Sequence, residues 1–191
     1  MKIILRQETT LPKIKKTESQ ITNRSYYLEK DGKRYRFLLE KEWSITKTTT
    51  LNKSATVILL NPHKANELIT DKTVMNVTNF VILEDYNSLK IVNLFPFMSK
   101  KPEALVTNSK EFIELNKQYI KKACENSEII ILACGAKGKY LPLKNQIYNE
   151  ILVEFKDKLR CFQDKEKNEN RHPRDMTDEW KLVKYKQNGI E

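Results

Sequence analysis

The chain has 191 residues, with 35 Lys and Arg against 25 Asp and Glu, which gives a formal net charge of +10. This length is typical of one domain with a substantial core. The first apolar run, residues 3–5, is too short for a signal peptide or a membrane span. We therefore expect a cytoplasmic protein with a single folded domain at residues 24–191, preceded by a basic arm at residues 1–23 that is extended or flexible.

The three cysteines, Cys124, Cys134 and Cys161, are an odd number and lack the CxxC spacing of a zinc or iron–sulfur site. The chain has only two histidines besides, and no helical HxxxH pair. We therefore expect reduced, half-buried thiols, no bound metal and no other cofactor.

The charge is distributed unevenly along the chain. Residues 1–55 hold 13 Lys and Arg but 6 Asp and Glu, so that +7 of the net +10 lies in this segment, which includes Lys15 and Lys16. Such a concentration of charge attracts phosphate backbones and indicates DNA or another nucleic acid as partner. The alternative is compositional drift in a lysine-rich proteome.

Residues 24–30 and 33–40 are strand-like and are joined by Asp31-Gly32, a dipeptide that favours tight hairpin turns. They predict an N-terminal antiparallel hairpin. Arg34 and Arg36 are two residues apart in its second strand, which places both guanidinium groups on one face. That face is either a nucleic-acid contact or an ordinary solvated surface.

From residue 56 onward, short apolar runs alternate with helical patterns, which is typical of βαβ units with buried parallel strands. We expect strands at residues 56–60, 88–95, 128–134 and 158–162, and a further strand-like run at 180–185. We expect helices at residues 72–83, 109–126 and 141–156, the first of them with Asp71 as its N-cap. The predicted fold is α/β, a three-layer sandwich with a central, mostly parallel four-stranded sheet and the hairpin in addition.

Sheets of this class bind ligands at the carboxyl ends of their strands, where loops leave polar groups unpaired. Four loops follow the predicted strands, with the sequences Asn61-Pro62-His63, Asn93-Leu94-Phe95-Pro96-Phe97, Gly135-Ala136-Lys137 and Arg171-His172-Pro173-Arg174. We expect all four to meet at one crevice.

Some of these residues also have a purely structural interpretation. Asn61 is as much a turn former before proline as a functional amide. Phe95 and Phe97 fit an ordinary core as well as a stacking platform for a base. Asp71 is the only carboxylate near the first loop, and its role as a helix cap competes with a catalytic one.

Two of these four loops also carry positive charge. Lys137 lies in a segment of glycines and lysines that suits a phosphate, but the full GxxxxGK[ST] loop is missing, so we do not expect ATP or GTP binding. His172 stands between Arg171 and Arg174, which are placed to guide phosphates to it.

The order of these motifs resembles a bacterial and phage family known as domain of unknown function 1643. The resemblance spans about residues 24–185. It is carried by the sequences ILLNPHKAN at 58–66, Asp71-Lys72-Thr73, IVNLFPF at 91–97 followed by Lys101-Pro102, ILACGAKG at 131–138 and RHPRD at 171–175. The layout is in turn similar to the uracil-DNA glycosylase superfamily, which implies a uracil-DNA glycosylase-like fold.

The second resemblance implies a role for each matching residue. Asn61 corresponds to the amide that positions the attacking water, and His172 to the histidine that stabilises the departing base. Asn93 takes the base-reading position, with Phe95 or Phe97 stacking on the base. The other substrate contacts would be Pro62, His63 and Gly135, and the nucleic-acid contacts Lys15, Lys16, Arg34, Arg36, Lys137, Arg171 and Arg174.

The function expected from this pattern is that of a DNA-associated, glycosylase-like hydrolase that excises a damaged or modified base. Asn61 can orient a water but cannot remove its proton, which a dissociative reaction tolerates. The first alternative is a non-catalytic module that recognises a nucleotide or modified base, for example in phage-related defence. The second is an enzyme of free nucleotides, for which the basic N-terminal third would be unnecessary.

Overall fold

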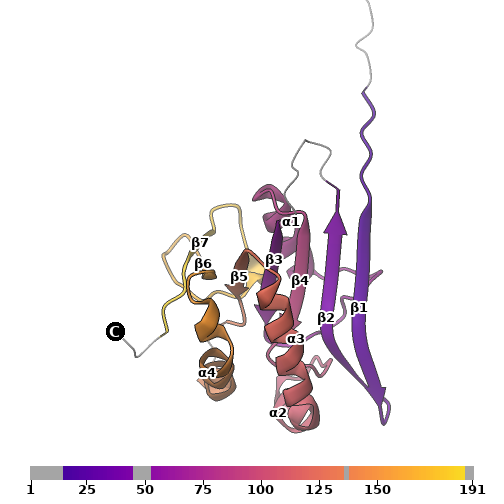
Figure 1. The fold of residues 1–191 in the computed structure, drawn as a ribbon, viewed down its shortest axis with the longest axis vertical. Coiled ribbons are helices and arrows are strands. Elements are labelled where there is room, and N and C mark those ends of the chain that lie inside the picture. The colour runs from indigo at the N-terminus through magenta and orange to yellow at the C-terminus, as the bar shows by residue number, and fades with distance from the viewer. Residues whose placement is uncertain (1–14, 45–52, 136–137, 188–191) are drawn as a thin grey trace, which may run out of the picture.

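A computed structural model of the protein describes residues 15–44, 53–135 and 138–187. Its strands are β1 (Ile21–Lys30), β2 (Lys33–Trp43), β3 (Ser54–Leu59), β4 (Ser88–Asn93), β5 (Ile129–Leu132), β6 (Leu159–Gln163) and β7 (Lys181–Lys184). They form one sheet in the order β1-β2-β4-β3-β5-β6-β7 (Figure 1). The predicted mixed α/β class is confirmed.

The helices are α1 (Lys72–Leu83), α2 (Leu105–Ser109), α3 (Ile113–Glu125) and α4 (Leu141–Glu150). Short 3-10 turns are η1 (Pro102–Ala104), η2 (Lys110–Phe112), η3 (Gly138–Tyr140), η4 (Leu152–Phe155) and η5 (Pro173–Asp175). The two longer predicted helices are therefore each broken, since α2 and η2 precede α3, and α4 ends at Glu150. In the part of the chain described, no helix is long and apolar enough to cross a membrane.

The sheet is mixed in direction. Strands β4, β3, β5 and β6 run parallel to one another, whereas β1, β2 and β7 are added antiparallel. More residues are paired antiparallel than parallel, because β1 and β2 are the longest strands of the sheet and pair with each other. The prediction of a four-stranded, mostly parallel sheet needs correction: the hairpin extends the sheet, since Leu39 of β2 pairs with Ile91 of β4.

Two apolar cores cover the two faces of the sheet. In β3, Ile58 packs into the core that contains Ile120 of α3 and Ile147 of α4. Its neighbour Val57 points the other way and packs with Val77 of α1. All six residues of β3 are buried, including the polar Ser54 and Thr56, as is typical of a parallel strand that is covered on both faces.

The hairpin turn forms where the sequence predicted it. Asp31 and Gly32 both have positive φ, 50° and 67°, as a two-residue turn with the right-handed twist of the strands requires. β1 begins at Ile21, three residues inside the predicted arm.

A β-bulge in β2 decides where Arg36 points. Tyr26 pairs with Leu38 and Tyr27 with Arg36, so that Phe37 has no opposite residue in β1. Phe37 stacks on Tyr119 of α3 with ring centroids 5.2 Å apart. In a regular strand, residues 36 and 39 would face opposite sides of the sheet. The extra residue instead turns Arg36 to the α1 face, on which Leu39 also packs.

Candidate functional site

A pocket of about 450 Å³ opens at the carboxyl end of β3, beside the N-terminus of α1. This end of the sheet is the one that the sequence predicted to carry the site. The residues that line the pocket are Arg36, Leu59, Asn61, His63, Asp71, Lys72, Thr73, Val74, Ser99, Lys100, His172 and Arg174. It therefore brings together all three predicted catalytic residues, Asn61, Asp71 and His172, and three of the predicted contacts, Arg36, His63 and Arg174.

Asp71 caps α1 and lines the pocket at the same time. One carboxylate oxygen, Oδ1, accepts a hydrogen bond of 3.0 Å from the backbone N–H of Val74, so the predicted N-cap is confirmed. The cap engages Oδ1 and leaves Oδ2 as the oxygen through which Asp71 can act on a ligand. The backbone N–H groups of Lys72 and Thr73 belong to the first turn, where no intrahelical acceptor exists.

Asn61 ties two loops of the pocket together. Its amide nitrogen donates to the carbonyl oxygens of Pro62, at 3.0 Å, and of Ser99, at 2.8 Å. The loop after β3 is thereby joined to the loop after β4. Contact with a ligand falls to the amide oxygen, Oδ1, which is an acceptor only. Pro62 is buried, and His63 is exposed at the pocket.

His172 is held in place by its own turn and by α1. Its Nδ1 accepts a hydrogen bond of 3.3 Å from the backbone N–H of Arg174. The neutral imidazole then carries its hydrogen on Nε2. Asn76 of α1 donates to the carbonyl oxygens of Pro173, at 2.7 Å, and Arg174, at 3.1 Å, and so fastens this loop to the helix.

Gly135 lies directly against the histidine loop. A Cβ placed on Gly135 would be 3.6 Å from the Cβ of His172, an ordinary contact distance. Its φ of +79° is what favours glycine at this position. The residue supports the loop by its backbone and does not line the pocket.

Arg36 is the most deeply buried charge of the pocket, with 2% of its surface exposed. Its Nη1 donates to the carbonyl oxygen of Ala65, whereas its Nε has no hydrogen-bond partner. Burial lowers the pKa of Arg36 to about 10, although the charges of Asp71 and Glu67 raise it. The guanidinium therefore stays cationic at neutral pH. The prediction that Arg36 lies on an exposed hairpin face was wrong: the bulge directs the side chain to the α1 face, where it contacts Ala65 of the loop after β3 and is buried.

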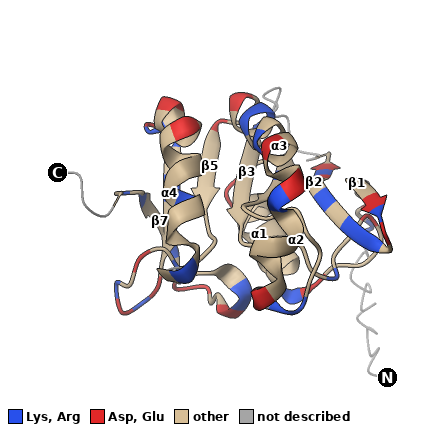
Figure 2. Cartoon of the chain, turned by 90° about the horizontal axis from the view of Figure 1, so that it is seen from below, with Lys and Arg blue, Asp and Glu red and all other residues tan. Residues whose placement is uncertain are grey.

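The rim of the pocket is also cationic. Lys72, Lys100 and Arg174 line it together with Arg36, against the single carboxylate of Asp71. Asp175 lies 3.6 Å from the Nζ of Lys72 and 3.2 Å from Nη2 of Arg174 and so holds both at the rim. Since these groups are exposed, the pairs contribute little to stability. Over the rest of this end of the molecule, basic and acidic residues are interspersed (Figure 2).

Asn93 does not reach the pocket as predicted. It is fully buried, and neither polar atom of its amide has a hydrogen-bond partner. It ends β4 opposite Leu59, whose side chain lines the pocket. Partners in a parallel ladder point to the same face, so the amide of Asn93 lies on the pocket side of the sheet without lining the pocket. Its two unsatisfied groups have no explanation in the structure. Asn116 of α3 binds the backbone carbonyl of Asn93 at 2.8 Å.

The two predicted stacking residues belong to the core on the opposite side. Phe95 is 3% exposed and meets Tyr140 edge to face, with ring centroids 5.5 Å apart. Phe97 packs against Tyr35 at 5.5 Å and forms an isolated bridge with it. Neither ring lines the pocket, so the core interpretation of both residues is correct and the stacking interpretation is wrong.

The predicted basic contacts are dispersed. Arg171 pairs with the buried Asp164 at 3.1 Å and lies over the ring of Trp180, so it is a structural residue of its loop. Arg34 is bound to Glu29, with 2.7 Å between Nε and the carboxylate. Lys15 and Lys16 are exposed before β1, and Lys16 pairs with Glu18. Lys137 lies outside the described residues.

The cysteines are more deeply buried than the sequence predicted. All three are free thiols, and Cys124 and Cys161 are fully enclosed. Burial raises the pKa of the Cys124 thiol to about 12. Among the described residues, no group of three His, Cys, Asp or Glu is arranged to hold a metal ion.

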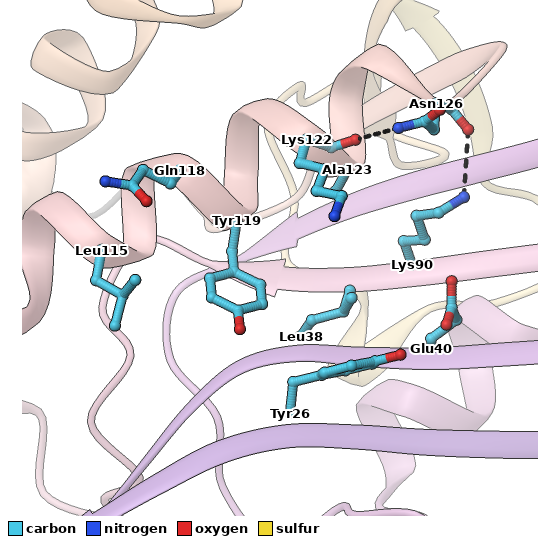
Figure 3. A pocket seen from close by; sticks show the side chains of 10 residues that line it. All are labelled: Tyr26, Leu38, Glu40, Lys90, Leu115, Gln118, Tyr119, Lys122, Ala123 and Asn126. Carbon is cyan, nitrogen blue, oxygen red and sulfur yellow. Dashed lines mark hydrogen bonds between the residues drawn. The ribbon is translucent and has the colours of Figure 1, made fainter.

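A second hollow, of about 590 Å³, lies on the other face of the sheet (Figure 3). There α3 faces β1, β2 and β4, and the apolar side chains of Tyr26, Leu38 and Tyr119 line the space, with Lys90 donating to the carbonyl oxygen of Asn126 at 3.2 Å. The loops that follow the parallel strands do not contribute to it. We therefore place the candidate site at the pocket beside α1.

Sequence reasoning missed part of this site. Ser99 and Lys100 line the pocket but stand outside the motifs of the sequence, and Thr73, which is in one of them, was not predicted as a site residue. The available signal was the N-cap at Asp71, because the residues after a cap present their N–H groups at the same spot.

The model of a family described as "Protein of unknown function (DUF1643)" matches residues 36–174 of the chain. The match begins at the first and ends at the last residue that lines the pocket, Arg36 and Arg174. No curated protein matches the chain.

Proposed function

We propose that this chain, which belongs to the family described as protein of unknown function (DUF1643), binds one nucleotide unit of a nucleic acid in the candidate pocket and hydrolyses its N-glycosidic bond. The observation that carries the proposal is the convergence of Asn61, Asp71 and His172, from three separate segments, on one pocket. The volume of about 450 Å³ is within the range of small-ligand sites. Leu59 and Val74 supply apolar surface for the flat face of a base.

Asn61 and Asp71 are suited to act on the attacking water. In the proposed reaction the water oxygen bonds to C1′ of the sugar, and the bond to the base nitrogen breaks. Asn61 Oδ1 accepts a hydrogen bond from this water and orients it, because the amide nitrogen is engaged by Pro62 and Ser99. Asp71 Oδ2 takes the proton, and its charge stabilises the cationic sugar. Asp71 thus supplies the base that an asparagine cannot.

His172 is suited to act on the leaving group. The departing base takes the electron pair of the broken bond and becomes anionic. Since Nδ1 of His172 accepts from the N–H of Arg174, Nε2 carries the ring hydrogen and is the atom that would donate to the leaving base. A donor placed where negative charge develops lowers the barrier more than it strengthens substrate binding.

The experiment that tests this proposal is a base-release assay. The protein is incubated with single- and double-stranded oligonucleotides that carry uracil, hydroxymethylated or glucosylated bases, and the products are treated with alkali to cleave abasic sites. We expect strand cleavage for at least one of these bases with the wild type and with Arg34→Ala, whose side chain lies on the hairpin outside the pocket. Intact strands throughout would contradict the proposal.

A second candidate function is recognition of a nucleotide or modified base without catalysis. It is favoured by the structural duties of Asn61 and Asp71, each of which already binds backbone groups. The same oligonucleotides separate the two functions. Tight binding of one modified base without abasic product would support recognition and remove the catalytic roles.

A further inference from the structure

We infer that the inner end of the pocket is a phosphate subsite, formed by Arg36 and the N-terminus of α1, which holds a phosphate group of the bound nucleotide. The inference rests on the proposed function for the nucleotide that carries the group. The subsite itself rests on the geometry of these residues.

Arg36 is the first observation that points to an anion. Arg36 is only 2% exposed, and it lines the pocket. Its Nε lacks a hydrogen-bond partner among the described residues. A buried cation with an unused donor costs free energy unless an anion or acceptor completes it. Among the described residues, no carboxylate is hydrogen-bonded to it, and its Nη1 donates to the neutral carbonyl oxygen of Ala65. Asp71 and Glu67 act on the guanidinium by their charge and leave its Nε to a ligand.

The N-terminus of α1 is the second observation. This helix has 12 residues, and Lys72, Thr73 and Val74 of its first turn line the same pocket as Arg36. The N–H of Val74 is taken by Asp71, whereas those of Lys72 and Thr73 are left to a ligand. Backbone N–H groups and the helix dipole together favour a phosphate oxygen.

The rim of the pocket adds positive charge and hydroxyl groups, which also favour an anion. Lys100 and Arg174 line the pocket, as do the hydroxyl residues Thr73 and Ser99. Asp71 is the one carboxylate among the lining residues and opposes anion binding. Lys72 and Arg174 share the carboxylate of Asp175, so Arg36 and Lys100 are the cations that offset Asp71. A dianionic phosphate monoester and a phosphodiester both satisfy this chemistry, from a free nucleotide or from a nucleic-acid backbone respectively.

The test is equilibrium binding of inorganic phosphate to the full chain, measured by isothermal titration calorimetry at low ionic strength. We expect saturable binding with one site, weakened about 10-fold or more by Arg36→Met, because a charge-assisted contact is lost. Arg34→Met, two residues along β2 and outside the pocket, should bind as the wild type does. Absence of saturable binding, or equal affinity of folded Arg36→Met, would overturn the subsite.

A second variant covers the case in which Arg36→Met fails to fold. The double variant Lys100→Ala/Arg174→Ala changes exposed residues of the rim and should also weaken phosphate binding several-fold; unchanged affinity would overturn the subsite. A matched pair of ligands, deoxyuridine and its 5′-monophosphate, should differ in affinity in favour of the phosphate, and equal affinity would count against it.

Competition experiments distinguish the two sources of the phosphate group, a nucleic-acid backbone and a free nucleotide. Displacement of inorganic phosphate by an oligonucleotide without terminal phosphates assigns the subsite to a backbone diester, and displacement by the mononucleotide alone assigns it to a free nucleotide. Failure of the subsite remains distinct from failure of the proposed function. Phosphate binding without base release removes the hydrolysis and leaves the subsite, whereas base release without phosphate binding does the reverse.

Discussion

Asn76 of α1 donates a hydrogen bond of 2.7 Å to the carbonyl oxygen of Pro173, nearly a hundred residues later in the chain. A second bond of 3.1 Å reaches the carbonyl oxygen of Arg174. These two contacts fasten the turn that begins at His172 to the helix that begins beside Asp71. The side chains of Asp71 and His172 share one pocket because the same helix supports both segments.

We predict that Asn76→Ala lowers base release by about 10-fold or more, since misplacement of a catalytic group by even about 1 Å is costly. Loss of two side chain–backbone bonds at a partly exposed site should reduce the free energy of unfolding by about 1–3 kcal/mol. Urea unfolding and single-turnover assays on one preparation measure both effects. Asn79→Ala, one turn later on α1 and outside the pocket lining, is the control. Unchanged turnover in Asn76→Ala would show that the helix does not position His172.

His172 allows its two proposed roles to be separated. In His172→Asn, the side-chain oxygen can still accept from the N–H of Arg174 as the N-cap of η5, but the Nε2 donor is gone. We predict a fall in kcat of about 10²-fold with KM changed much less, because the donor acts on charge that develops in the transition state. His172→Ala should lose the turn as well and raise KM. A similar rise in KM for both variants, with kcat retained, would assign His172 to substrate docking.

Asp164 links the pH dependence of stability to the same loop. Burial opposes its ionisation, but hydrogen bonds from Asn168 and the charge of Arg171 outweigh this and lower the pKa of Asp164. A lowered folded-state pKa stabilises the protein above the unfolded-state value of about 3.9, and this contribution is lost as the pH falls through the folded-state pKa. We therefore predict that Asp164→Asn is less stable than the wild type at pH 7, and that the difference shrinks below about pH 4.

Urea midpoints at pH 7 and pH 3 measure this difference. Asp157→Asn is the matched control, because Asp157 is exposed and lies 4.0 Å from its partner Lys184. It should change the midpoint little at either pH. A gap between Asp164→Asn and wild type that is the same at both pH values would show that the carboxylate charge of Asp164 does not stabilise the loop.

Local sequence signals predicted the framework of the site. The N-cap at Asp71, helix α1 and the Asp31-Gly32 turn each depend on neighbouring residues alone, and all three were found where expected. The pocket at the strand ends follows from the direction of the parallel strands. What the sequence could not show is register. The bulge at Phe37 depends on pairing with β1 and packing against Tyr119, and it sets the face of the sheet to which Arg36 points.

The prediction that Asn93 lines the pocket failed for a related reason. A loop motif after a strand indicates which end of the sheet a residue occupies. It does not indicate whether the side chain lines a pocket or is enclosed by its neighbours. Asn93 is still part of β4 and is fully buried, so neighbouring residues enclose its amide instead of a loop presenting it. Phe95 and Phe97 follow at the point where the chain turns toward Tyr140 and Tyr35 on the opposite face.

Asp71 provides the most direct test of the proposed chemistry, because its cap and its proposed catalytic role can be separated by one substitution. Asparagine caps a helix about as well as aspartate. We predict that Asp71→Asn keeps its urea midpoint close to that of the wild type, whereas Asp71→Ala loses about 1 kcal/mol of unfolding free energy. The measurement is the single-turnover rate of base release by wild type, Asp71→Asn and Asp71→Ala on the oligonucleotide that the wild type cleaves. The proposed function predicts a loss of about 10²-fold or more in both variants, since neither can take the water's proton; wild-type turnover in folded Asp71→Asn would contradict it and leave Asp71 a helix cap.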